Sequence, residues 1–227
     1  MESHEQLTPT EARIIGSLIE KAETTPDNYP LSTNALVAAC NQSTNRDPVM
    51  TLGERDVDQT MMELRQRGFA RTLSGTGHRV PKHRHVIDEA LALDGDETAV
   101  LAVLLLRGAQ TRNEITTRTE RYDGGPGGDV ERVDAALDRL AARDEPLIVR
   151  LERRPGEREP RIEQLWAQTP GDASASPVAT ADAAAASPSP PPIASAGSPD
   201  RVAELEAQVA GLTKRIARLE SELGIDD

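Results

Sequence analysis

The feature that most constrains the fold of this chain is an internal repeat across its first 168 residues. Each copy opens with a helical pattern that carries a capping box, Thr8 with Glu11 in the first copy and Asp94 with Glu97 in the second. The apolar faces of these two helices also correspond: Ile14, Ile15, Leu18 and Ile19 match Val100, Leu101, Leu104 and Leu105. Each copy is about 80 residues long, which is enough for a small independent core.

The remaining segments of the two copies follow one order. A second helical segment begins at Ser32 in the first copy and at Thr111 in the second. The third helix repeats most clearly, because Val57, Asp58, Met61 and Leu64 match Val133, Asp134, Leu137 and Leu140. Two β-like segments follow it in each copy, at 69–74 and 79–87 and at 147–151 and 161–166. This order predicts a mainly α fold with small β-hairpins, built from tandem winged-helix domains at residues 7–87 and 94–168.

The C-terminal quarter of the chain has a different character. Residues 169–199 contain seven prolines among alanines and serines, which predicts a disordered linker. Residues 200–224 then predict a coiled-coil helix, and its heptad spacing favours a parallel homodimer, although one helix docked on its own domain is the alternative. The seam residues are Val202, Leu205, Val209, Leu212, Ile216, Leu219 and Leu223.

Four longer motifs are specific enough to compare with known families. They are the segments 24–32, from Thr24 to Ser32, and 39–50, from Ala39 to Met50, together with 104–111 and 154–159. These motifs resemble the YceH family of bacterial proteins. The similarity covers about residues 7–168, and the heptad tail agrees with it. The resemblance implies tandem winged-helix domains and does not imply an activity.

The strongest electrostatic feature lies at residues 64–87, where no acidic residue occurs. This segment covers the end of the third helix and the first hairpin, a position from which guanidinium groups can contact phosphates. The alternative is a solvated hairpin whose arginines pair with acids elsewhere in the chain. With one residue from the loop at 41–52 and two from the third helix, the candidate residues for binding double-stranded DNA are Arg46, Arg55, Gln59, Arg65, Arg67, Arg71, Arg79, Lys82 and Arg84.

Other charges argue against extensive binding of nucleic acid. The net charge is −12, and both third helices carry several acids. Only four residues are aromatic, which excludes a protein that stacks single-stranded bases on aromatic platforms. The second domain is therefore expected to contact protein rather than DNA. The alternative function for the whole chain is a protein-interaction scaffold that uses the acidic third helices and the coil to bind protein partners.

Catalysis has little support in the sequence. Cys40, the one cysteine, falls on the apolar face of a predicted helix and is expected in the core. His78, His83 and His85 lack a fourth ligand for a metal site and are expected on the hairpin surface. No nucleophile or dinucleotide motif occurs. We therefore expect a non-enzymatic cytoplasmic protein without a cofactor, a metal site, a signal peptide or a membrane span.

Overall fold

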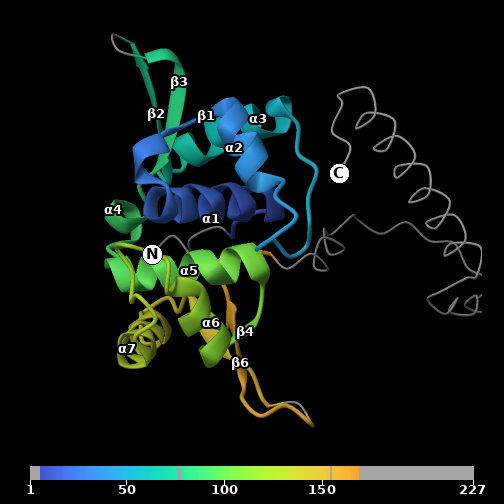
Figure 1. Ribbon diagram of the computed structural model, residues 1–227, viewed down its shortest axis with the longest axis vertical. Coiled ribbons are helices and arrows are strands. Elements are labelled where there is room, and N and C mark those ends of the chain that lie inside the picture. The colour runs from blue at the N-terminus through green and yellow to red at the C-terminus, as the bar shows by residue number, and fades with distance from the viewer. Residues whose placement is uncertain (1–5, 76–77, 154, 169–227) are drawn as a thin grey trace, which may run out of the picture. The chain divides into compact units, whose positions relative to one another are not determined.

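The computed structural model describes residues 6–75, 78–153 and 155–168. The predicted linker at 169–199 and the predicted coiled-coil helix at 200–224 lie outside these residues, and so do all seven seam positions. The homodimer therefore stays a prediction. The fold is mainly α-helical with small antiparallel sheets, as the sequence predicts (Figure 1).

The first repeat contains three main helices and a three-stranded sheet. Its elements in order are α1 (Pro9–Thr24), η1 (Pro26–Asn28), β1 (Leu31–Ser32), α2 (Thr33–Cys40), α3 (Glu54–Gln66), β2 (Ala70–Gly75) and β3 (His78–His85). The sheet has the order β1-β3-β2 and is antiparallel. The helix starts follow the predicted capping signals, since Thr8 and Glu11 form a capping box and the Ser32 side chain accepts a bond from the N–H of Ala35.

The second repeat has the same order of elements. They are α5 (Gly95–Arg107), β4 (Gln110–Thr111), α6 (Arg112–Thr119), α7 (Val130–Ala141), β5 (Ile148–Arg150) and β6 (Arg161–Gln164). Its sheet has the order β4-β6-β5, which matches the first sheet strand for strand. The boxes Asp94 with Glu97 and Thr111 with Glu114 both form.

Two details differ from the prediction. A two-residue strand before each second helix, β1 or β4, pairs with the hairpin as a third strand, because its backbone lies against β3 or β6. Ile87, expected at the end of the return strand, instead begins the short helix α4 (Ile87–Leu91), where it is fully buried. Helix α4 connects the two repeats.

The two repeats share one apolar core because α1 and α5 pack side by side (Figure 1). The helices approach closely at Gly16, where an added Cβ would lie 2.8 Å from the Leu106 side chain. A second contact between the repeats lies further along the chain, where the Trp166 ring of the second repeat meets Phe69 of the first edge-on at 5.1 Å. Residues 7–168 consequently form a single packed body.

Helix α5 lies at the centre of this body, and every residue from Glu97 to Leu106 is buried. It contacts α1, α6, α7 and β6, which explains why it is apolar on all sides. A helix of 13 residues is shorter than the ~20 residues that a bilayer requires. Within the part of the chain that the structure describes, no helix is long and apolar enough to cross a membrane.

Candidate nucleic-acid interface

The hairpin β2–β3 places basic side chains on one of its faces. Its register sets Arg71 opposite Arg84 and Leu73 opposite Lys82. Directly opposed residues of an antiparallel pair point to the same face, and so do residues two apart on one strand. Arg71, Lys82 and Arg84 therefore share a face, which we call the basic face of the hairpin.

The opposite face of the hairpin is held against the helices by His83. This histidine is 4% exposed, and its Nδ1 and Nε2 atoms lie 3.1 Å and 3.0 Å from the hydroxyl oxygens of Thr72 and Thr33. Burial lowers the pKa of the His83 imidazole, and the nearby Asp58 carboxylate opposes that shift. The ring thus joins the hairpin to α2 as a buried, neutral group.

The histidines do not assemble a metal site in the described residues. Both ring nitrogens of His83 already have hydroxyl partners. His85 lies with its Nδ1 3.6 Å from an Asp88 carboxylate oxygen, while its backbone N–H donates to the Tyr29 hydroxyl. The side chain of His78 lies outside the described part. The sequence predicted that these histidines lie on the hairpin surface, whereas in the structure the His83 side chain is buried.

A groove separates the basic face from helix α3. Its volume is about 460 Å³, and Arg65 from α3 lines it together with Arg71 from β2. The Arg65 side chain is exposed, and its guanidinium group forms no hydrogen bond or ion pair with any described residue. Met62, with 51% of its surface exposed, lies on the same wall. The side chains of Arg65 and Arg71, which come from different elements, therefore line the same surface groove.

The basic face keeps an excess of positive charge. A single carboxylate, that of Glu89, pairs with both Arg71 at 2.9 Å and Arg84 at 3.1 Å. All three side chains are at least one-third exposed, so water screens these pairs and a phosphate group can replace Glu89. The Lys82 ammonium group has no hydrogen-bond or ion-pair partner within the described residues.

Helix α3 is less suited to a polyanion than the hairpin beside it. Arg55 and Gln59 are exposed on its outer surface, and Gln59 donates a hydrogen bond to Glu63. The acids have structural partners: Asp56 accepts the Gly53 N–H at the helix start, and Asp58 accepts the Thr33 hydroxyl. These hydrogen bonds do not remove the negative charge of the two carboxylates. The cationic part of this surface is therefore the hairpin and the end of α3.

Arg46 does not belong to this surface, which corrects its assignment from the sequence. Its side chain is fully buried, and its guanidinium group lies 2.6 Å from a Glu20 carboxylate oxygen and donates to the Ala39 carbonyl oxygen. Arg67 is also engaged inward, since it pairs with Glu11 at 2.7 Å and lies over the Phe69 ring. The side chain of Arg79 lies outside the described part of the chain.

The loop between α2 and α3 explains the burial of Arg46. The side-chain amide of Asn41 bonds both the N–H and the carbonyl oxygen of Leu52 at 2.8 Å, which closes the loop on itself. The Asp47 N–H donates to the Leu106 carbonyl oxygen of α5. The sequence left open whether this loop contacts phosphates, contacts a partner or satisfies its own backbone. In the structure it bonds to itself and to the second repeat.

Each of four arginines around α7 in the second repeat pairs with a different aspartate. Arg132 pairs with Asp96 at 2.6 Å, and Arg150 pairs with Asp138 at the same distance. Two further pairs join Arg139 to Asp94 at 2.7 Å and Arg112 to Asp134 at 3.3 Å. Each of these guanidinium groups has its own aspartate, so this surface carries no comparable cationic excess.

Cys40 lies where the sequence placed it. The side chain is fully buried between α1 and α2, and burial raises the pKa of its thiol to about 11. A thiol with a raised pKa and no exposure is a poor nucleophile at neutral pH. Cys40 therefore serves as a small core residue.

Comparison with known proteins places this chain in a family. The model described as "Protein of unknown function, DUF480" matches residues 7–157. A UPF0502 protein of Burkholderia cenocepacia (strain HI2424) is 42% identical over 221 residues, which is 97% of this chain and 91% of that protein. The UPF0502 protein YceH of Salmonella newport (strain SL254) is 42% identical over 224 residues, covering 96% and 98%. The resemblance to YceH proteins is thereby confirmed, and this chain belongs to the UPF0502 family.

Proposed function

We propose that each repeat is a winged-helix domain and that the protein is a non-enzymatic, DNA-associated protein. The element order and the hairpin that follows each third helix support the domain assignment. The observation that carries the function is the cationic excess at one surface. Arg71 and Arg84 share one carboxylate, Lys82 lies on the same face, and Arg65 lines a groove together with Arg71.

This surface would bind the phosphate backbone of a duplex. Guanidinium groups form charge-assisted hydrogen bonds with phosphate oxygens, and such contacts fix a protein on DNA without reading its sequence. Arg55 and Gln59 of α3 lie nearest to where base edges would be approached, but the acids of that helix weaken its contribution. We therefore expect affinity that depends strongly on salt and weakly on sequence.

The predicted coil would strengthen this weak contact. If residues 200–224 pair two chains, two DNA-binding surfaces are held together, and the second contact gains from effective concentration. The predicted linker would allow the two surfaces to reach variably spaced positions. A protein that contacts DNA in this way would act in the cytoplasm, where bacterial DNA lies.

A salt titration of duplex binding tests the proposal. The double variant Arg65→Ala with Lys82→Ala removes two cations that lack partners, so its fold should be unaffected. It should weaken binding to unrelated duplexes equally and reduce the slope of log affinity against log salt by about two units. The matched control is Arg153→Ala with Arg158→Ala, which removes two exposed arginines from the second hairpin and should leave the slope unchanged.

Two results would overturn the proposal. One is an unchanged affinity and slope in the folded Arg65→Ala, Lys82→Ala protein. The other is an intact protein that binds no duplex even at low salt. The second result would favour the alternative of a protein-interaction scaffold, in which the acidic surfaces of α3 and α7 contact protein partners.

A further inference from the structure

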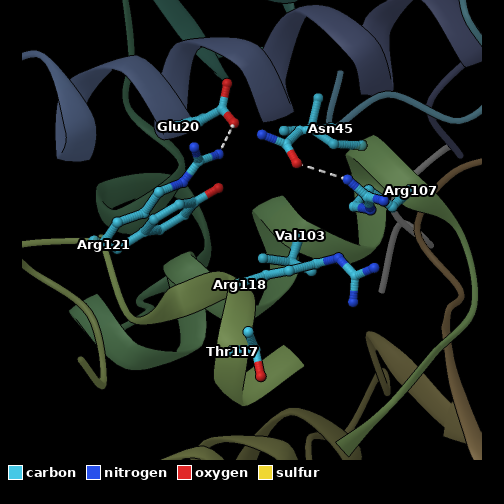
Figure 2. A pocket seen from close by; sticks show the side chains of 9 residues that line it. Glu20, Asn45, Val103, Arg107, Thr117, Arg118 and Arg121 are labelled. Atoms are coloured by element: carbon cyan, nitrogen blue, oxygen red, sulfur yellow. Dashed lines mark hydrogen bonds and ion pairs between the residues drawn. The ribbon is translucent and has the colours of Figure 1, made fainter. Parts of the chain in front are cut away.

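A pocket of about 260 Å³ lies at the junction of the two repeats (Figure 2). The first repeat contributes one acid from α1 and one amide from the loop after α2. The second repeat contributes residues of α5 and α6 and of the loop that follows α6. The lining residues are Glu20, Asn45, Val103, Leu106, Arg107, Thr117, Arg118, Arg121 and Tyr122.

The pocket has more cations than its one carboxylate can balance. Glu20 is 2% exposed and pairs with Arg121 at 2.9 Å, but the same carboxylate also pairs with the buried Arg46 at 2.6 Å. Arg107 donates to the neutral amide oxygen of Asn45 at 2.8 Å (Figure 2). It forms no ion pair with any residue of the described chain.

Arg118 is the least compensated of these cations. Within the described residues its guanidinium group has no hydrogen-bond or ion-pair partner, and in Figure 2 its side chain extends toward the side of the pocket where Arg107 lies. Burial lowers the pKa of Arg118, and the positive charge of Arg107 lowers it further, although Glu114 raises it. Two like charges in a partly desolvated site are stabilised when an anion binds between them.

Part of the remaining wall is apolar. Val103 and Leu106 of α5 are at most 2% exposed, and Tyr122 is 3% exposed. The volume falls just below the ~300 Å³ at which pockets for drug-sized ligands begin, so a ligand that fits is small. A ring or short hydrocarbon can lie against this wall while an oxyanion faces the arginines.

We propose that this pocket binds a small organic anion, with a carboxylate or phosphate group held by Arg107 and Arg118 and an apolar part against Val103 and Leu106. The site is distinct from the basic face of the hairpin and shares no residue with it. Both repeats line the pocket, so an occupied site would stabilise their contact. The bound anion thus has the position of an effector rather than of a substrate.

Calorimetry on the full chain at constant ionic strength tests this site with three probes. Benzoate and phenyl phosphate share a ring and differ in the oxyanion, and benzyl alcohol keeps the ring without the charge. At least one anion should bind with a 1:1 stoichiometry, and benzyl alcohol should bind at least about tenfold more weakly. The better anion identifies the class of ligand.

Two variants assign the binding to the pocket. Arg118→Gln should weaken the better anion about tenfold or more, whereas Arg153→Gln, which removes an exposed arginine from the second hairpin, should not change it. The unliganded Arg118→Gln protein should melt at the same temperature as the original or higher, because repulsion from Arg107 is lost. The site is refuted if neither anion binds saturably, or if Arg118→Gln binds the better anion as well as the unchanged protein does.

Discussion

The two repeats have the same elements in the same order but opposite electrostatic arrangements. In the first repeat Arg71 and Arg84 share Glu89, while the charged groups of Arg65 and Lys82 have no ion-pair partner within the described residues. In the second repeat the arginines around α7 have individual aspartates, as Arg132 and Asp96 illustrate. The apolar pattern that specifies the fold is therefore preserved between the copies, whereas the surface charges are free to differ. This difference is why we propose the first repeat alone as a contact for DNA.

The loops after the second helices show where the two repeats converge. The first loop buries Arg46 against Glu20, and the second brings Arg121 to the same carboxylate. The second loop also donates the Gly124 N–H to Glu23 of α1. Both loops thus contact the C-terminal half of α1. The junction between the repeats therefore depends on the buried carboxylate of Glu20, which pairs with an arginine from each loop.

The largest effect is expected when this shared acid is neutralised. Glu20→Gln keeps the shape of the side chain but leaves Arg46 buried without a counter-charge. Removing one partner of a buried ion pair costs about 3–5 kcal/mol, and the free energy of unfolding in urea should fall by that amount. The matched control is Glu89→Gln, which breaks two surface pairs and should change the free energy of unfolding by less than about 1 kcal/mol. Equal losses in the two variants would show that the junction is not held by Glu20.

A second pair of variants tests the electrostatic difference between the repeats. Glu89→Gln releases Arg71 and Arg84 in the first repeat, and Asp138→Asn releases Arg150 in the second. The first change should tighten duplex binding several-fold at low salt and increase the salt slope by about one unit, because the freed guanidinium groups contact phosphate more fully.

Asp138→Asn is the control for that experiment, since it also removes one acid that pairs with a hairpin arginine. It should leave the salt slope as it is. If both variants tighten binding equally, net charge rather than the first hairpin determines the affinity. The proposal that only the first repeat contacts DNA would then be wrong.

The smallest expected effect is the change in the free energy of unfolding with pH, and it arises in the first repeat. The second repeat contains no histidine, whereas burial lowers the pKa of both His83 and His85. The unfolded chain therefore takes up protons first as the pH falls below about 6.5, and the stability present above that value decreases. The decrease for each histidine cannot exceed about 1.4 kcal/mol per pH unit.

Urea unfolding at pH 7.5 and pH 5.5 measures this dependence. The unchanged protein should be less stable at pH 5.5, and His83→Gln should lose part of the difference because one titrating group is gone. A free energy of unfolding that is equal or higher at pH 5.5 would contradict the lowered pKa values of His83 and His85.

The candidate site could be predicted only in part. The basic segment at 64–87 pointed to Arg65, Arg71, Lys82 and Arg84, which lie near one another around the hairpin, because charges near a hairpin are visible as a run in the sequence. Arg46 was misassigned, because its burial depends on Glu20, which lies 26 residues away in the chain. The pocket at Arg118 was missed for the same reason, since its walls come from both repeats and no local pattern joins them.

The sequence by itself determined the local structure of this protein. Capping boxes specify where helices start, and the spacing of apolar residues specifies which faces are buried, because both depend on neighbours within a few positions. The tertiary structure decided how the copies combine. Two glycines show this well: a Cβ on Gly125 would lie 2.7 Å from Ala99, and one on Gly95 would meet the Gly124 carbonyl oxygen. Such requirements arise from close approach between distant segments, so they exist only once the chain has folded.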